Sequence, residues 1–329
     1  MTTLVLEAAD PLAIGRAVDL LVAGETVALP TETVYGLAAD ALRPEAVVKI
    51  FEAKERPFFD PLIVHLPTMD WLDRIAEIPR ESRTLVDALI GEFWPGPLTL
   101  VLPRREIVPD IVTSGLDTIA VRMSAHPVFQ VVIEKFAKPL AAPSANRFGR
   151  ISPTASEHVF AELNNRIPLI VDGGGTMHGI ESTIVRPEGD RIEILRSGPI
   201  TQEQLSEFGE VRFAHAAGKP DAPGQLASHY APRTPLEVCE RASVRSALHS
   251  RAERKGFLAW QMAPEGIAWE PVEVLSVTGD LREAAATLFA KLRKLDDAGL
   301  EVIYVEPVPE HGLGIAIMDR LRKAAAPKP

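Results

Sequence analysis

The chain has 329 residues, 46% of them hydrophobic, which exceeds the usual size of one domain and suffices for buried cores. We therefore expect two domains. The formal net charge of −10 excludes a surface that coats nucleic acid nonspecifically, although it leaves room for a local basic pocket. No segment approaches the roughly 20 apolar residues of a membrane span, and no secretion signal opens the chain. The single cysteine, Cys239, excludes an internal disulfide or thiolate metal cluster and favours a cytoplasmic protein.

The first two thirds of the sequence predict an α/β domain. Asp10 and Pro11 can begin a helix that Gly24 ends, and residues 26–29 then form a strand. Helical spacing over residues 44–54 is ended by Pro57. The remaining predicted elements are strands at 62–64, 98–102, 118–121, 169–171, 183–185 and 192–195, and helices at 127–137 and 153–163. A mixed twisted sheet covered by helices accounts for this alternation.

The last third predicts a linker and a smaller α/β domain. Residues 210–233 lose periodicity and are rich in glycine and proline, so we expect domains at 1–209 and 234–329. The second domain has predicted strands at 236–239, 256–260, 272–277 and 300–305 and helices at 243–254 and 280–296. This order is Rossmann-like, but no GxGxxG follows the first strand, so a dinucleotide site is not expected.

Two short motifs predict a site for an anion. Lys54-Glu55-Arg56 places two cations at the exit of a predicted helix, and Ser144-Ala145-Asn146 places two short polar side chains on a predicted tight loop. Together they suit a polyphosphate. Taken alone, these two motifs are explained better by a solvated helix end and an ordinary turn, because surface charge pairs are common.

Other polar residues lie at predicted strand ends. The segment Thr31 to Gly36 follows a strand directly, where α/β sheets place their binding residues, but it also fits a plain polar turn. His65 and Arg122 each close a strand; the alternatives are a buried core histidine and a structural ion pair. Ser182 begins a strand with a hydroxyl group.

Several other motifs do not predict a binding or catalytic site. Residues 173–179 are rich in glycine but lack the lysine of a phosphate loop, and His178 and Glu181 have no helix to align them as metal ligands. Residues 94–97 (WPGP) predict a rigid turn with a packed indole. No HExxH, GxSxG or CxxC occurs, so covalent and zinc catalysis lack candidates.

Five motifs together carry a family resemblance. They are residues 29–37 (LPTETVYGL), 54–57 (KERP), 94–99 (WPGPLT), 142–146 (APSAN) and 181–184 (ESTI). In this order and spacing they resemble the YrdC-like domain of threonylcarbamoyl-AMP synthase, over about residues 8–208. Residues 222–232 (APGQLASHYAP) and 312–318 (GLGIAIM) resemble the long, two-domain form of that family.

The resemblance implies a nucleotidyltransferase. The family joins L-threonine, bicarbonate or carbon dioxide, and ATP into L-threonylcarbamoyladenylate, with release of pyrophosphate and water. The product supplies the machinery that transfers the threonylcarbamoyl group to tRNA, and Mg²⁺ is the expected partner of ATP. One alternative is a YrdC-like RNA-binding or regulatory module without adenylation activity, which the acidic composition disfavours. Another is a carbamoyl-transfer maturation factor, whose zinc-finger cysteines are missing here.

The resemblance also assigns roles to residues. Those implied for L-threonine are Thr31, His65, Arg122, Ala142 and Ser182. Those implied for ATP are Lys54, Arg56, Thr118, Ser144, Asn146, Ser152, Arg196 and Tyr230. Lys54 and Arg56 are the catalytic candidates, through charge stabilisation, and Ser144 and Asn146 are candidates near Mg²⁺.

The segment 210–233 would then form a lid that brings Tyr230 to the adenylate. In this chain Gln225 to Ser228 replace the basic residues that many long members carry, and Asp319 replaces a common asparagine, so the lid contacts differ here. Replacement of Lys54 or Arg56 by alanine should lower synthesis strongly and leave folding nearly intact, because we expect both side chains to face solvent.

Overall fold

The computed structural model describes residues 2–214, 221–239, 254–262 and 271–327. Its contacts divide the chain into two compact units. The first comprises Met1–Phe148, Pro153–Met177 and Glu181–Gln225, and the second comprises Gly149–Ser152, His178–Ile180 and Leu226–Pro329. Two short pieces of the first two hundred residues therefore belong to the second unit, which no local sequence pattern indicates.

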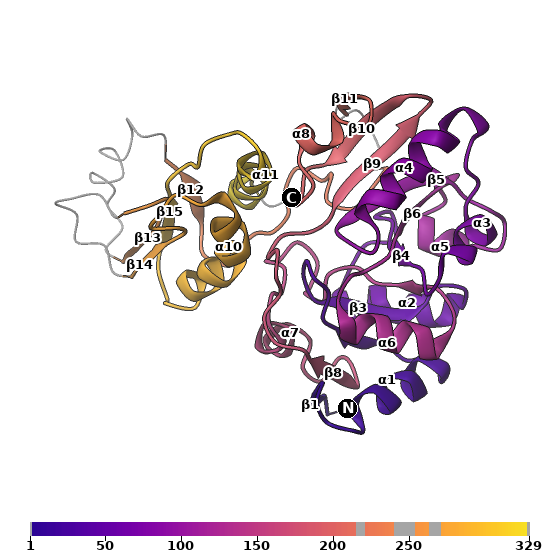
Figure 1. Ribbon diagram of the computed structural model, residues 1–329. Helices are drawn as coiled ribbons and strands as arrows, with labels where there is room; N and C mark the ends of the chain where they lie inside the picture. Colours follow the sequence, from indigo (N-terminus) through magenta and orange to yellow (C-terminus); the bar gives the residue numbers. More distant parts are fainter. Residues whose placement is uncertain (1, 215–220, 240–253, 263–270, 328–329) are drawn as a thin grey trace. The chain divides into compact units, whose positions relative to one another are not determined.

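The first unit is built on one large mixed sheet (Figure 1). Its strand order is β1-β8-β2-β3-β7-β4-β6-β5-β9-β10-β11. The strands are β1 (Leu4–Glu7), β2 (Val27–Leu29), β3 (Gly36–Asp40), β4 (Ile63–His65), β5 (Leu98–Pro103), β6 (Thr118–Arg122), β7 (Leu140–Ala141), β8 (Leu169–Asp172), β9 (Thr183–Glu188), β10 (Arg191–Arg196) and β11 (Glu210–Phe213). Strands β4 and β6 are parallel, whereas β5 and β6 are antiparallel.

Helices pack on this sheet, and α2 best shows how the sequence fixes them. Helix α2 (Pro44–Lys54) has the predicted limits: Pro44 suits its first turn, and Glu55 ends it in the left-handed conformation at φ 52°. The other helices are α1 (Ala13–Val22), α3 (Leu72–Ile75), α4 (Arg83–Phe93), α5 (Asp110–Thr113), α6 (Pro127–Phe136), α7 (Ser156–Leu163) and α8 (Gln202–Leu205), with short 3₁₀ turns η1 (Met69–Trp71) and η2 (Arg80–Ser82).

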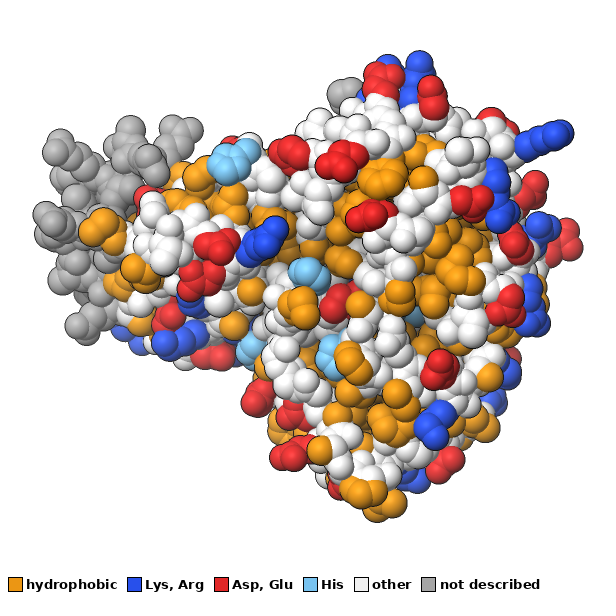
Figure 2. All heavy atoms as spheres, in the orientation of Figure 1, with side chains coloured by type: hydrophobic (Ala, Val, Ile, Leu, Met, Phe, Trp, Pro, Cys, Tyr) orange, Lys and Arg blue, Asp and Glu red, His pale blue; other side chains and the backbone are white. Residues whose placement is uncertain are grey.

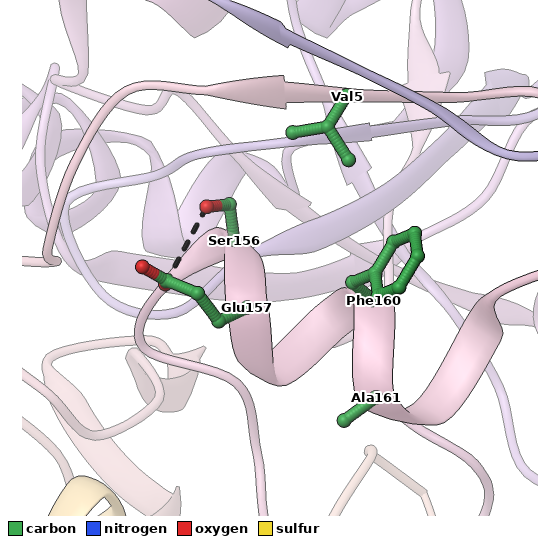
Figure 3. Close-up of a pocket in the computed structure, with 5 residues that line it drawn as sticks. All are labelled: Val5, Ser156, Glu157, Phe160 and Ala161. Carbon is green, nitrogen blue, oxygen red and sulfur yellow. Dashed lines mark hydrogen bonds between the residues drawn. The ribbon is translucent and has the colours of Figure 1, made fainter.

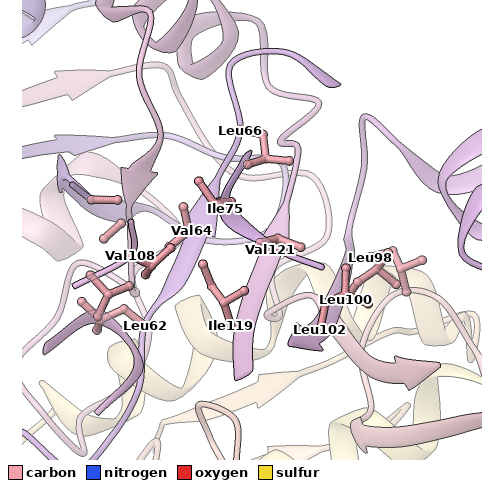
Figure 4. Close-up of a cluster of buried hydrophobic side chains, with 14 of the residues drawn as sticks. Leu62, Val64, Leu66, Ile75, Leu98, Leu100, Leu102, Val108, Ile119 and Val121 are labelled. Atoms are coloured by element: carbon pink, nitrogen blue, oxygen red, sulfur yellow. The ribbon is translucent and has the colours of Figure 1, made fainter. Parts of the chain in front are cut away.

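Alternation along the central strands separates a core face from a polar face. In β6, Ile119 and Val121 enter the main hydrophobic core, together with residues of β4 and β5 (Figure 4). Thr118, Ala120 and Arg122 point to the opposite face, because successive side chains of a strand alternate. The core thus fixes the register of β6 and, with it, the face on which Arg122 lies.

The second unit contains a four-stranded parallel sheet in the order β12-β15-β13-β14. In the described residues its strands are β12 (Leu236–Val238), β13 (Lys255–Ala259), β14 (Val272–Val274) and β15 (Val302–Val305), and its helices there are α10 (Leu281–Asp296) and α11 (Leu313–Ala325). Asp280 caps α10 by accepting a hydrogen bond from the backbone N–H of Arg282. The smaller α/β unit expected from the sequence is confirmed.

Some local predictions need correction. The segment expected to be irregular from residue 210 begins with β11, which pairs in parallel with β10. Helix α1 begins at Ala13 because the Asp10 carboxylate caps the turn before it, through the N–H of Leu12. Helix α11 was not predicted, and the helix predicted at 243–254 lies almost wholly outside the described residues.

Charged side chains of both signs are scattered over one face of the molecule. On the face of the described residues drawn in Figure 2, acidic and basic side chains are interspersed and do not gather into one basic patch. Such a surface does not suit broad contact with a nucleic-acid backbone. Within the described ranges, no helix has the length and apolar content that crossing a membrane requires.

Candidate functional site

The exit of α2 turns Lys54 and Arg56 inward and Glu55 outward. The left-handed conformation of Glu55 makes this possible, and its exposed carboxylate pairs with Arg147 at 3.1 Å and Arg166 at 2.6 Å. Lys54 is 1% exposed and Arg56 is 7% exposed. The expectation that both cations face solvent is therefore wrong: burial of Ile50 and Phe51 on the same helix carries them into the interior.

Lys54 joins the two motifs that suggested an anion site. Its Nζ donates hydrogen bonds to the backbone carbonyls of Ser144 and of Asn146, the latter at 2.5 Å. The backbone N–H of Phe148 returns a bond to the Lys54 carbonyl at 2.8 Å. An ammonium group has three N–H donors, so two fix its position and one remains for a ligand as far as the described residues show.

Burial dominates the electrostatics of Lys54. Desolvation and then the neighbouring Arg56 guanidinium hold the pKa of Lys54 well below its ordinary value, and the charges of Asp60 and Glu162 oppose them. A negatively charged ligand beside Nζ would raise this pKa again, because it stabilises the ammonium form. An anionic ligand would therefore offset the desolvation of the Lys54 ammonium group.

Asp60 is a buried acid that the sequence analysis missed. Its carboxylate is 2.9 Å from Nη2 of Arg56, and Arg56 also donates to the backbone carbonyls of Asp60 at 3.2 Å and Pro61 at 2.7 Å. Desolvation raises the pKa of Asp60, whereas Arg56, Lys54 and Arg196 lower it in part. We call Lys54, Arg56, Arg196 and Asp60 the cation cluster.

A second group lies where strand β6 ends. Nη2 of Arg122 is 2.7 Å from Oε1 of Glu32, and both side chains are about 5% exposed. Both terminal nitrogens of Arg122 also donate to the Thr33 hydroxyl, at 3.1 and 3.2 Å, and the Ser124 hydroxyl donates to Glu32 at 2.5 Å. We call Glu32, Thr33, Arg122 and Ser124 the strand-end cluster.

The charge of this second group is balanced. Burial alone raises the pKa of Glu32, but the Arg122 guanidinium, the Ser124 hydroxyl and backbone N–H groups outweigh it and hold the pKa below its ordinary value. Glu32 is therefore ionised. Nε of Arg122 is buried and has no hydrogen-bond partner among the described residues, so one donor is available to a ligand.

His65 and Thr31 lie beside the strand-end cluster. His65 pairs with Arg122 in the β4–β6 register, and its ring lies 4.5 Å from that of Phe129. Desolvation, then the charge of Arg122, holds the pKa of His65 well below its ordinary value, so the imidazole is neutral. The Thr31 hydroxyl donates to the Val34 carbonyl and accepts from the N–H groups of Thr33 and Val34, which uses its hydrogen-bonding capacity.

Arg196, at the end of β10, holds Ser182. Its Nε and Nη2 donate to the Ser182 carbonyl at 3.0 and 2.9 Å, and Nη2 also reaches the Ser182 hydroxyl at 3.0 Å. The Ser182 hydroxyl is 2.8 Å from that of Thr99 on β5. The charge of Arg196 also acts on Asp60. These side chains come from separate sequence segments, and no local pattern predicts that they meet.

The remaining predicted residues of the first unit have distinct places. The backbone N–H of Ala142 donates to the Ile63 carbonyl at 2.9 Å, beside β4. Thr118 begins β6, so it shares a face with Arg122 but lies roughly 13 Å away along the strand. Between them on that face, Ala120 packs in a small buried apolar cluster with residues such as Ile63 and Val101.

Ser152 and Tyr230 belong to the second unit. The Tyr230 ring is 1% exposed, stacks on Phe289 at 5.6 Å and lies under the Arg320 guanidinium at 5.2 Å. The backbone N–H of Ala231 donates to Gly149, next to the piece that contains Ser152. Within this unit both residues are buried, and their part in ATP binding stays a prediction.

One cavity of the first unit has a separate lining. It has a volume of about 290 Å³ and is lined by Val5 of β1 and by Ser156, Glu157, Phe160 and Ala161 of α7 (Figure 3). The lining is mainly apolar and contains none of the predicted site residues. The cavity is therefore not where the candidate chemistry takes place.

Comparison with known families supplies the deciding observation. A family model described as telomere recombination matches residues 19–198, and a model described as the C-terminal domain of threonylcarbamoyl-AMP synthase matches residues 200–326. The chain belongs to the threonylcarbamoyl-AMP synthase family. The proteins of that name from Pyrococcus abyssi and Bacillus subtilis are 41% and 40% identical to it, over 92% and 95% of this chain and 91% and 92% of theirs.

Solved structures agree with this assignment. The crystal structure of Pyrococcus abyssi Sua5 complexed with L-threonine has a TM-score of 0.89 at 39% identity and covers 98% of both chains. A variant of that protein, with a histidine and the following tyrosine replaced by alanine, has a TM-score of 0.88 at 37% identity and covers 98% of this chain and 96% of that one. Escherichia coli YciO, at 20% identity and a TM-score of 0.50, shares the fold of 60% of the chain and spans 96% of its own.

Proposed function

We propose that the chain synthesises L-threonylcarbamoyladenylate from L-threonine, bicarbonate or carbon dioxide, and ATP, as a nucleotidyltransferase. The observation that carries this proposal is the presence in one unit of a buried cation cluster and a buried, charge-balanced strand-end cluster. ATP is a polyanion and threonine is a zwitterion, so the two clusters match the two substrates in charge. The product would serve the machinery that modifies tRNA beside the anticodon, in the cytoplasm.

The reaction makes two bonds and breaks one link of ATP. The threonine amine adds to carbon dioxide, loses a proton and becomes a carbamate. A carbamate oxygen then attacks the α-phosphorus of ATP, and the bond to the β-phosphate oxygen breaks as pyrophosphate leaves. Lys54, Arg56 and Arg196 would offset the charge that gathers on these phosphates, so catalysis rests on positioning and charge stabilisation.

L-Threonine fits the strand-end cluster in charge and hydrogen bonding. Arg122 offers its Nε to the substrate carboxylate, and neutral His65 and Ser182 offer uncharged polar atoms to the hydroxyl and amine. Thr31 would act through the loop that it orders, since its own hydroxyl is occupied. Ala142 would contribute its backbone and its small size.

Magnesium fits as a partner that ATP brings. No group of three or more carboxylate, histidine or cysteine side chains in the described ranges forms a metal cage. Mg²⁺ commonly keeps several waters and binds through substrate phosphates, and the Ser144 hydroxyl and the Asn146 side chain are neutral groups that suit such an ion. When bound, it would supply further charge neutralisation at the phosphates.

The lid was predicted at residues 210–233; because β11 (Glu210–Phe213) belongs to the large sheet, the lid role is proposed for the segment that follows it. Tyr230, Ser152 and Thr118 are proposed ATP-binding residues, and the segment Gln225 to Ser228 contains no basic residue. Gln225 instead accepts hydrogen bonds from the backbone N–H groups of Asp221 and Ala222, which orders the turn before it. Replacement of Tyr230 by phenylalanine or alanine, with ATP KM measured in both, separates a hydroxyl contact from ring packing.

The decisive experiment measures pyrophosphate release with each substrate omitted in turn. Release that requires L-threonine, bicarbonate and ATP together is the expected result, with L-threonylcarbamoyladenylate identified by mass spectrometry. Release without threonine dependence would contradict the proposal. Tight RNA binding with a steep salt dependence and no adenylate would instead favour an RNA-binding module.

A further inference from the structure

Asp60 is a buried acid that lies close to basic side chains. Asp60 follows the turn after α2, and its side chain is 0% exposed. Its carboxylate lies 2.9 Å from the Arg56 guanidinium. Beyond that ion pair, neither carboxylate oxygen accepts a hydrogen bond from a described residue. A buried carboxylate usually accepts several hydrogen bonds. Because Asp60 accepts none from a described residue beyond its ion pair, we infer that it acts at this position through its negative charge.

The groups that face Asp60 come from separate elements. Lys54 and Arg56 lie at the exit of α2, and Arg196 ends β10; all three charges act on the Asp60 carboxylate. Glu162 of α7 acts on Lys54. Three buried cations without an internal anion would be costly to fold, and three cations fully neutralised would not attract a phosphate chain.

Arg56 does not depend on this carboxylate alone for its position. Its guanidinium also donates to the backbone carbonyls of Asp60 and Pro61, which no side-chain replacement removes. An asparagine at position 60 could still accept a hydrogen bond from Arg56. The charge of Asp60 and the placement of Arg56 can therefore be separated by experiment.

We propose that Asp60 is the internal counter-ion of the cation cluster: it stabilises the empty site and weakens polyphosphate binding, so that pyrophosphate can leave. Asp60 is a positioning residue, because it acts through Arg56. This inference rests on the proposed function, which places the ATP phosphates at the same cluster. The proposal predicts that replacing Asp60 tightens the binding of polyphosphate, whereas damage to the structure would weaken it.

The test compares pyrophosphate binding to the full chain by titration calorimetry at pH 8. Asp60→Asn should lower the Kd for pyrophosphate about tenfold, because a like charge next to the ligand is removed. Asp60→Ser, which also removes the charge but fills less space, should shift the Kd in the same direction. Asp87→Asn is the matched control, since Asp87 is an exposed acid of α4 paired with Arg83.

Steady-state kinetics supply the second readout. In Asp60→Asn the KM for ATP should fall and kcat should fall with it, since pyrophosphate leaves more slowly. Unchanged pyrophosphate affinity in both Asp60 variants would overturn this inference and leave the proposed function standing. No pyrophosphate binding by the unaltered chain would overturn the proposed phosphate site as well, so the two failures are distinguishable.

Discussion

The cation cluster and the strand-end cluster both contain buried arginine and carboxylate side chains, but they differ in net charge. In the cation cluster three basic side chains share one acid, Asp60, so positive charge remains for a ligand. In the strand-end cluster Arg122 and Glu32 form a closed ion pair that Ser124 and Thr33 complete. The first suits a polyanion and the second a zwitterion. Charge balance, more than residue type, distinguishes a phosphate site from an amino-acid site.

Replacement of Lys54, in the cation cluster, should have the largest effect on activity. Lys54→Ala should lower the rate of pyrophosphate release by at least about a thousandfold, because a contact to the transferring phosphate is lost. It should also cost about 1–3 kcal/mol of unfolding free energy, since the buried carbonyls of Ser144 and Asn146 lose their donor. Release assays and urea unfolding measure the two effects.

Lys49→Ala provides the control for Lys54→Ala. Lys49 lies on the same helix but is half-exposed and pairs with Glu25 at 2.7 Å. Its loss should change the unfolding free energy by less than about 1 kcal/mol and leave the rate unchanged. Wild-type turnover in Lys54→Ala would remove Lys54 from the phosphate site.

The strand-end cluster should respond through stability and threonine binding together. Glu32→Gln leaves Arg122 buried without its counter-charge, which should cost about 3–5 kcal/mol of unfolding free energy. The KM for threonine should rise while the KM for ATP changes little, if the clusters serve separate substrates. Ser124→Ala, which removes only one hydrogen bond to Glu32, should shift both quantities in the same direction and by less. Equal changes in both KM values would contradict the separation.

His65 makes the strand-end cluster sensitive to acid. Its folded pKa lies well below 6.5, so the unfolded chain binds a proton first as the pH falls. The stability that His65 contributes is complete above pH 6.5 and is lost as the pH falls toward the folded pKa, at about 1.4 kcal/mol per pH unit. His65→Asn should have a shallower loss of unfolding free energy between pH 7 and 5.5, measured by urea unfolding. A slope equal to that of the unaltered chain would show that His65 is not held neutral.

The sequence predicted features that depend on neighbouring residues, but not those that depend on residues distant in the chain. The limits of α2 followed from Pro44, Pro57 and local apolar spacing, and Arg122 at the end of β6 followed from the strand pattern. Lys54 was placed correctly at the helix exit, but its inward direction depends on the left-handed Glu55 and on carbonyls ninety residues away. Local patterns contain neither fact.

Asp60 and Glu32 show the limit more clearly. Each is an acid in a loop, and a lone acid in a loop is usually solvated. Only the fold brings Asp60 against Arg56 and Arg196, and Glu32 against Arg122. A signal was present for Asp60, since it lies four residues after Arg56 among apolar neighbours. That spacing indicates an ion pair only when the turn is known.

The smallest expected effect concerns Glu55, which separates the two inward cations. Glu55→Gly should raise or lower the unfolding free energy by less than about 1 kcal/mol, because relief of the left-handed conformation offsets the loss of exposed pairs with Arg147 and Arg166. Glu55→Ala loses the pairs and keeps the strain, so it should be the less stable of the two. Both should retain pyrophosphate release within about twofold, provided the backbone turn alone directs Lys54 and Arg56 inward. A large loss of activity in Glu55→Gly would mean that the outer ion pairs, and not the turn, hold the cation cluster in place.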